Sequence, residues 1–264
     1  MPTLRVRDID MYYEVSGEGP PLLLLHGLGS STRDWEYQVP VFSKKFKVIT
    51  VDARGHGRSD KPAGPYSVAQ FAADHAEFIR MMKTGPLQVA GLSMGGVIAF
   101  QLAVDYPDLA RSMCIVNAGP ELLLPRLQDK FMLFTRLFIV RVLGMRMVGR
   151  KLAGEMFPHK HQAEFKKKLI DRWAENDKGA YLDTVNALVG WSVADRIENI
   201  TCPVLVIRGE LDDTPLEVTD AQLARMPNAK KVVVKDSRHA TPVDSIDEFN
   251  RLLMEFLKST EPAG

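Results

Sequence analysis

The sequence has few cysteines, no excess of either charge and no long hydrophobic run. Its only cysteines, Cys114 and Cys202, lie in apolar runs, which excludes a secreted disulfide framework and predicts free thiols in a reducing compartment. Lys and Arg number 34 against 33 Asp and Glu, so no overall field attracts nucleic acid or an acidic membrane. No run approaches the length of a membrane span, and the N-terminal segment lacks a signal-like apolar core. We therefore expect a cytoplasmic protein that acts on a small molecule, with no nucleic-acid partner; these features do not favour membrane association.

Two familiar kinds of binding motif are also missing. Residues 27–32 (GLGSST) and 55–60 (GHGRSD) each follow an apolar run, yet neither completes G-x-G-x-x-G. His26, His56 and Asp52 lie close to these segments, but no H-E-x-x-H or comparable spacing of metal ligands occurs. We therefore predict neither a cofactor nor a metal.

The sequence is rich in short apolar runs that end in glycine or in a polar loop. Hydrophobic residues make up 45% of the chain, which is enough for a large core. The runs occupy residues 21–27, 46–55, 87–93, 111–119, 202–213 and 230–240. Strands that are buried on both faces of a parallel sheet have this pattern, and segments with helical periodicity, such as 67–83, lie between them. The sequence therefore predicts an α/β fold with a doubly wound, mostly parallel sheet, preceded by a hairpin over residues 3–17.

One serine lies in an unusual concentration of glycine. Residues 91–95 read GLSMG, a match to G-x-S-x-G, with an apolar strand before it and an apolar helix after it. A sharp turn between strand and helix needs very small neighbours, and it would present the hydroxyl of Ser93 at a helix N-terminus, where a negative oxygen is favoured. The alternative is a structural turn in which Ser93 merely caps the helix.

A serine hydroxyl needs a positioned base, and the base needs an orienting group. Of the downstream histidines, His159 and His161 lie in a charged helical context, whereas His239 alone follows a predicted strand. Asp212 ends another strand, and its neighbour Asp213 directly precedes a helix start. Capping boxes at residues 214–217 and 245–248 predict those helix starts, which puts Asp212 and His239 on loops at the carboxyl edge of the sheet.

In their order along the chain, LLHGLG, VDARGHGRSD, GLSMGG, VIRGELD and DSRHA resemble the α/β-hydrolase superfamily, in its esterase, enol-lactonase and haloperoxidase-like group. The resemblance covers nearly all of the chain outside residues 119–195. It implies the α/β-hydrolase fold, with Ser93 as nucleophile, His239 as general base and acid, and Asp212 as the orienting carboxylate. It further implies an oxyanion hole formed by the backbone N–H groups of Leu28 and Met94. Arg238 stands where the family commonly has glycine, which affects the detail of that loop.

Residues 119–195 contain no good strand, and we expect them to form a helical cap on a core domain of residues 1–118 and 196–264. In the cap, Gly144 and Gly149 suggest breaks between short helices, and Gly179 could close a helix that contains Trp173. The most apolar stripe of the cap comprises Phe131, Phe134, Phe138, Val142 and Met145. It suggests the underside of a lid over the serine or, as an alternative, a surface that binds membranes. Arg136, Arg141 and Arg146 would not gather on one polar face of a helix, which favours short cap helices that cover the pocket. Trp191 could line the cleft or pin the cap to the core.

Three functions fit these features. The first is hydrolysis of a carboxylic ester, thioester or lactone of a small, moderately hydrophobic substrate through an acyl-enzyme. The second is another reaction of the same residues, namely cofactor-free haloperoxidase or perhydrolase activity, or C–C bond hydrolysis of a dienoate. The third is a non-catalytic ligand receptor or scaffold, because a fold alone does not fix a function. Ser93 argues against dehalogenase and epoxide hydrolase relatives, which use an aspartate at the nucleophile position.

Overall fold

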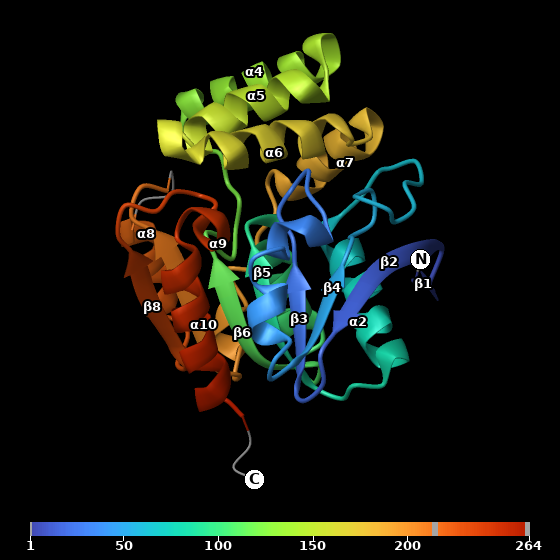
Figure 1. Ribbon diagram of the computed structural model, residues 1–264, viewed down its shortest axis with the longest axis vertical. Helices are drawn as coiled ribbons and strands as arrows, with labels where there is room; N and C mark the ends of the chain where they lie inside the picture. Colours follow the sequence, from blue (N-terminus) through green and yellow to red (C-terminus); the bar gives the residue numbers. More distant parts are fainter. Residues whose placement is uncertain (1, 213–215, 262–264) are drawn as a thin grey trace.

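An eight-stranded sheet forms the centre of the protein (Figure 1). The computed structural model describes residues 2–212 and 216–261. The strand order is β1-β2-β4-β3-β5-β6-β7-β8; β1, β2 and β4 pair antiparallel, and every pairing from β4 to β8 is parallel. The strands are β1 Thr3–Val6, β2 Ile9–Ser16, β3 Pro21–Leu25, β4 Lys47–Val51, β5 Leu87–Leu92, β6 Ala110–Val116, β7 Val204–Gly209 and β8 Ala229–Val234. The predicted doubly wound sheet and N-terminal hairpin are confirmed.

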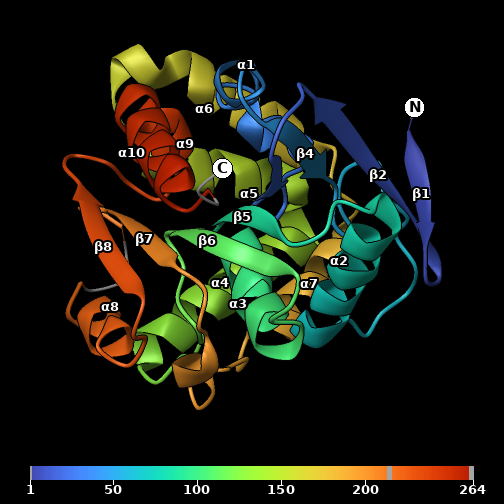
Figure 2. The same ribbon diagram turned by 90° about the horizontal axis from the view of Figure 1, so that it is seen from below.

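Helices cover both faces of the sheet because its central strands are apolar on both sides (Figure 2). One face packs against 3₁₀ helix η1 (Thr32–Trp35), α1 (Val39–Phe42) and α10 (Ile246–Ser259), with α9 (Thr241–Asp244) between η1 and α10. The other face packs against α2 (Val68–Met82), α3 (Met94–Asp105), η3 (Ile197–Asn199) and α8 (Leu216–Leu223).

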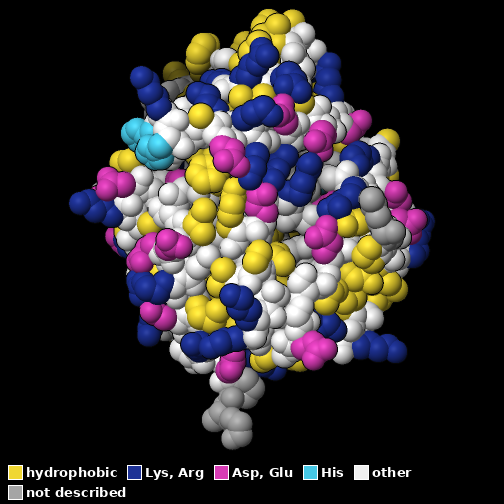
Figure 3. Space-filling view, viewed as in Figure 1, with side chains coloured by type: hydrophobic (Ala, Val, Ile, Leu, Met, Phe, Trp, Pro, Cys, Tyr) yellow, Lys and Arg dark blue, Asp and Glu magenta, His cyan; other side chains and the backbone are white. Residues whose placement is uncertain are grey.

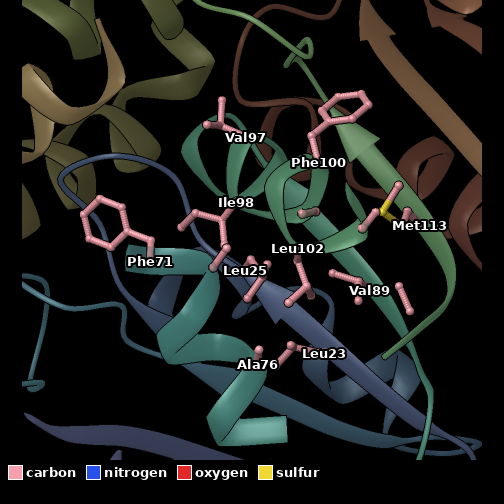
Figure 4. Packing of buried hydrophobic residues seen from close by; sticks show 14 of the residues in the cluster. Leu23, Leu25, Phe71, Ala76, Val89, Val97, Ile98, Phe100, Leu102 and Met113 are labelled. Carbon is pink, nitrogen blue, oxygen red and sulfur yellow. The ribbon is translucent and has the colours of Figure 1, made fainter. Parts of the chain in front are cut away.

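The α2–α3 side holds the larger part of the core (Figure 4). Phe71 of α2 and Ile98 of α3 are buried there beside Leu25 and Val89 of the sheet. These contacts hold α2 and α3 against β3 and β5. The ends of those two strands carry the loops that form the site described below.

Between β6 and β7 the chain leaves the sheet and forms a group of helices, called the insert below. The two ends of the insert meet in an antiparallel bridge between Glu121 and Ser192. Above the bridge lie α4 (Leu127–Leu143), α5 (Met145–Met156), η2 (Lys160–Gln162), α6 (Ala163–Ala174) and α7 (Lys178–Leu188). These helices cover the carboxyl ends of the strands (Figure 1). Among the residues described, no helix combines the length and the apolar character needed to cross a membrane.

The structure confirms the helix break predicted at Gly144 but not the roles predicted for Gly149 and Gly179. Gly144 does separate two helices, α4 and α5. The expected break at Gly149 is wrong: this glycine lies inside α5, where a Cβ would come within 2.9 Å of the Trp173 side chain, so it permits the close packing of α5 on α6. Gly179 does not close α6, which ends at Ala174; it belongs to the first turn of α7, capped by Asp177.

The two predicted capping boxes also differ from expectation. Ser245 is the N-cap of α10, but its side chain makes no capping hydrogen bond, because the short helix α9 runs directly into this position and sets its backbone at φ −136° and ψ 53°. The box that begins at Thr214 lies outside the described residues, as does Asp213.

Candidate active site

Ser93 occupies a tight turn between β5 and α3. β5 ends at Leu92 and α3 begins at Met94, so a single residue makes the turn, with φ 53° and ψ −113°. This backbone conformation is strained for a residue with a side chain. A Cβ on Gly91 would lie 2.3 Å from the carbonyl oxygen of Gly95, and a Cβ on Gly95 would lie 2.1 Å from that of Leu25. The glycines are therefore required by the close approach of strand and helix.

Replacement of Gly95 by alanine is accordingly expected to destabilise the fold. The new methyl group would press against the backbone of β3, which cannot rotate away, and overpacking of this kind costs about 1–3 kcal/mol or more. Gly154→Ala is the matched control, because Gly154 lies in α5 and a Cβ there would meet only the end of the Lys166 side chain, at 3.8 Å. We expect that control to raise the free energy of unfolding by about 0.5–1 kcal/mol. Urea denaturation measures both, and equal effects of the two substitutions would contradict the packing argument.

Three of the predicted site residues lie in one hydrogen-bonded chain. The Oγ of Ser93 is 2.9 Å from Nε2 of His239, and Nδ1 of His239 is 2.5 Å from Oδ2 of Asp212. A carboxylate only accepts, so Nδ1–H donates to Asp212, and Nε2 is left to accept the proton of the Ser93 hydroxyl. Ser93 makes no side-chain capping bond to α3, so the interpretation of it as a simple helix cap does not describe this structure.

The three residues differ in exposure in a way that suits acid–base chemistry. The side chain of Asp212 is 2% exposed, whereas that of His239 is 34% exposed. A buried carboxylate is held in one orientation, and the imidazole it orients remains within reach of a bound molecule. This arrangement can transfer a proton between Ser93 and a ligand at the sheet edge.

Arg208, which the sequence analysis did not single out, pairs with Asp212. Its Nη2 donates to Oδ1 of Asp212 at 2.6 Å, and the Arg208 side chain is 1% exposed. Asp212 thus accepts from a guanidinium at one oxygen and from His239 at the other. An arginine within the apolar run of β7 was the available signal, because a buried arginine requires an acidic or carbonyl partner.

Asn117 and Asp244 fix the loop that carries His239. From the end of β6, Nδ2 of Asn117 donates to the carbonyl of His239 at 2.9 Å, and its Oδ1 accepts from the Gly209 N–H at 2.8 Å. Asp244 accepts from the Arg238 N–H at 2.8 Å. Asn117 therefore connects the last residue of β7 with the loop after β8, a role that the sequence analysis missed because an amide cannot replace the orienting carboxylate.

The loop after β3 carries Leu28, and hydrogen bonds to Asp34 and His26 hold this loop in place. The Gly27 N–H donates to Oδ2 of Asp34 at 2.9 Å, and the Ser30 hydroxyl donates to the other oxygen of that carboxylate. Desolvation by the surrounding protein raises the pKa of Asp34 above its ordinary value. Nε2 of His26 accepts from the Ala53 N–H at 3.0 Å, so its Nδ1–H donates to the Gly27 carbonyl. His26 therefore connects the loop after β3 with the segment that follows β4.

Leu28 and Met94 both lie next to the turn that carries Ser93, since a Cβ on Gly27 would be 3.8 Å from the Cβ of Ser93 and Met94 directly follows Ser93. Leu28 follows β3, and Met94 opens α3. Neither N–H donates a hydrogen bond to any residue in the described part of the chain. Two such donors beside a nucleophile are what stabilisation of a tetrahedral oxyanion requires. Their assignment to an oxyanion hole stays a prediction.

The insert meets this loop through α6 and the residues after it. The ring of Trp173 would lie 3.1 Å from a Cβ added to Gly29, and Nδ2 of Asn176 donates to the Gly29 carbonyl at 2.7 Å. Arg172 donates to Glu36 at 2.8 Å. The side chain of Leu28 packs against the apolar cluster of the insert, which contains Val140, Met145, Val148, Trp173, Tyr181 and Val185. The part of the insert that covers this loop is therefore apolar, and hydrogen bonds from Asn176 and Arg172 hold it at its margin.

Trp191 and three histidines have structural positions away from the hydrogen-bonded chain of Ser93. Trp191 donates its indole N–H to Oε1 of Gln101 in α3 at 2.7 Å, so it pins the end of the insert to the core. His159 and His161 are exposed and stack on each other at the surface of the insert. His56 is buried, and desolvation lowers its pKa to about 3, so it stays neutral at ordinary pH.

The sequence matches the alpha/beta hydrolase fold family over residues 20–245. The chain belongs to this family. An (E)-2-((N-methylformamido)methylene)succinate hydrolase of Acinetobacter baylyi is 27% identical to it over 94% of each chain.

Two solved structures extend the likeness of this alpha/beta hydrolase. The enol-lactonase of Burkholderia xenovorans has a TM-score of 0.89 and 25% identity, over 97% of this chain and 100% of that one. A bromoperoxidase of Bacillus anthracis has a TM-score of 0.89 and 26% identity, over 97% and 99%. The predicted family is confirmed, and the chain is similar to hydrolases along nearly its whole length.

Proposed function

We propose that the protein is a serine hydrolase that cleaves a carboxylic ester, thioester or lactone of a small, moderately hydrophobic substrate. The observation that carries this proposal is the continuous hydrogen-bonded chain from Ser93 through His239 to Asp212 on a strained turn. No cofactor is required, since a serine with a positioned base and an oriented imidazole is sufficient for acyl transfer.

The reaction begins when Oγ of Ser93 attacks the carbonyl carbon of the ester. His239 takes the hydroxyl proton at Nε2, and Asp212 stabilises the imidazolium through Nδ1–H. The N–H groups of Leu28 and Met94 donate to the oxyanion, with a contribution of about 3 kcal/mol each in such sites. Nε2–H then protonates the leaving oxygen or sulfur as its bond to carbon breaks. Water, deprotonated by His239, attacks the acyl-enzyme and releases the acid and Ser93.

The helical insert would act as a cap that selects the substrate. We assign residues 119–195 to the cap and residues 1–118 and 196–264 to the core domain, a division supported by the bridge between Glu121 and Ser192 at the base of the insert. The apolar cluster above Leu28 favours an alkyl or aryl group over a charged one. Methionine in that cluster, such as Met145, can adapt to acyl groups of several shapes.

A fluorophosphonate probe tests the proposed nucleophile directly. We expect stoichiometric labelling of the wild-type protein, none of Ser93→Ala, and normal labelling of Ser259→Ala, in which a serine at the end of α10 is removed instead. Intact-protein mass spectrometry measures the adduct. A correctly folded wild-type protein that resists the probe would exclude an activated serine and favour a receptor or scaffold.

The similarity to the bromoperoxidase favours perhydrolysis as a second candidate. Here hydrogen peroxide replaces water in the second step and attacks the acyl-enzyme, which gives a peracid and restores Ser93. A panel of p-nitrophenyl esters of increasing chain length, assayed with and without peroxide, separates hydrolysis from perhydrolysis. Activity confined to dienoates, with simple esters inert, would instead indicate C–C bond hydrolysis.

A further inference from the structure

The outer face of α4 carries a continuous apolar stripe that no part of the described chain covers. The stripe consists of Leu127, Phe131, Phe134, Phe138 and Val142, whose exposed fractions lie between 52% and 84%. Their spacing of three and four residues puts them on one side of the helix. The sequence predicts that Phe131, Phe134, Phe138, Val142 and Met145 form one stripe on the underside of a lid. The structure corrects this: Met145 begins α5 and is buried in the cluster of the insert, whereas the other four face outward. Helix α4 is the outermost element of the insert, on the side away from the sheet (Figure 1).

Contacts on the opposite side of α4 fix this orientation. Val140 is fully buried in the cluster of the insert. Arg136 points the same way and donates to the hydroxyl of Tyr181 at 2.6 Å. The helix therefore cannot turn its stripe inward without exposing Val140 and breaking the Arg136–Tyr181 bond. Exposure of three phenylalanines on one helix face is far outside what scattered surface residues explain.

The stripe lies in the most basic part of the chain. Residues 126–151 contain seven Lys and Arg and a single acidic residue, Asp129, although the whole chain is nearly neutral. Asp129 is already paired with Arg126. Lys130 and Arg141 lie on α4 beside the stripe, and neither has an ion-pair partner among the described residues. In Figure 3 the top of the molecule shows mainly hydrophobic and basic side chains, with few acidic ones.

We propose that α4 docks the protein on an anionic lipid surface. An amphipathic helix with aromatic and aliphatic side chains on one face and basic residues at its margin binds in the interface plane of a bilayer. Charge complementarity decides the class of partner: basic residues close to the surface attract anionic headgroups, while the stripe enters the acyl boundary. This surface is independent of the proposed ester hydrolysis, because none of its residues contacts Ser93, His239 or Asp212.

A second copy of the chain fits the same face less well. A two-fold dimer through the stripe would bring equivalent patches together, so Lys130 and Arg141 of one copy would approach the same basic residues of the other. The one acidic residue of this segment, Asp129, is engaged with Arg126. Repulsion between like charges would oppose burial of the stripe in such a dimer.

Vesicle flotation tests the proposal, with the complete chain and vesicles of phosphatidylcholine mixed equally with phosphatidylglycerol. We expect Phe131→Ser/Phe134→Ser to lower the partition coefficient at least tenfold. Lys130→Gln/Arg141→Gln should lower it by roughly five-fold per charge on the anionic vesicles and little on pure phosphatidylcholine. Raising the salt concentration should weaken wild-type binding. Met81→Ser, which removes an exposed apolar side chain from α2, is the control and should change partitioning less than twofold.

Thermal melts by circular dichroism confirm that each variant is folded. Neither the melts nor the flotation assay depends on the proposed ester hydrolysis. Absence of wild-type flotation with the anionic vesicles would overturn the proposal, as would binding that the two phenylalanine substitutions leave unchanged. Analytical ultracentrifugation tests whether a second copy of the chain binds the stripe instead. A concentration-dependent dimer that Phe131→Ser/Phe134→Ser abolishes, together with no flotation, would identify a second copy and not lipid as the partner.

Discussion

Replacement of Ser93 by alanine is expected to lower kcat for a p-nitrophenyl ester by about 10⁵- to 10⁶-fold, because loss of a nucleophile removes the whole covalent route. KM should change little, since the substituted atom is one oxygen and the apolar ceiling above Leu28 is untouched. Any activity that remains should come from the oxyanion donors and from substrate binding. Steady-state kinetics of the wild-type protein and of Ser93→Ala with the same p-nitrophenyl ester measure the effect.

The same measurement on two further variants shows whether Ser93 and His239 act as a unit. His239→Ala should cost about as much as Ser93→Ala, and the double variant should cost no more than either, because the second loss has nothing left to remove. Ser93→Ala should also keep the urea midpoint of the wild-type protein, since alanine and serine face the same backbone strain at φ 53°. A loss of less than tenfold in kcat would contradict the assignment of Ser93 as nucleophile.

The sequence predicts best what local chemistry determines. The apolar run before Ser93 and the glycines around it lie within one short segment, and only a tight turn reconciles them; the structure has that turn. His239 and Asp212 are 146 and 119 residues away from Ser93, yet their position at the end of parallel strands places them at the same edge. The parallel sheet thus turns sequence order into spatial order, which is why the site geometry follows the prediction.

Features that depend on the partner of a residue could not be predicted. The stripe of Phe131, Phe134 and Phe138 has helical period, but a period does not say whether the apolar face meets the protein or the outside. The role of Gly149 depends on Trp173, which lies on another helix. In the sequence this glycine suggests a helix break, whereas in the structure it permits the close packing of two helices. Asn117 contacts the His239 loop across 122 residues, and nothing near it in the sequence indicates that contact.

Replacement of Asp212 by asparagine is expected to lower kcat by about 10⁴-fold, since an amide no longer holds Nδ1 of His239 as the donor and the reactive tautomer is lost. In this protein the substitution should also reduce stability. The carboxylate of Asp212 is the acceptor for buried Arg208 at 2.6 Å, and removing one charge of a buried pair costs about 3 kcal/mol or more. Kinetics measure the first effect and urea denaturation the second.

A double-mutant cycle separates these two roles of Asp212. Arg208→Met replaces the guanidinium by an apolar side chain of similar length, so Asp212→Asn/Arg208→Met should be more stable than Asp212→Asn alone, while kcat stays low. Recovery of stability without activity would assign the Asp212–Arg208 pair to the fold and the Asp212–His239 bond to the reaction. If activity returned with stability, Asp212 would act only by holding β7 and its loop in place, and the orienting role proposed for it would be wrong.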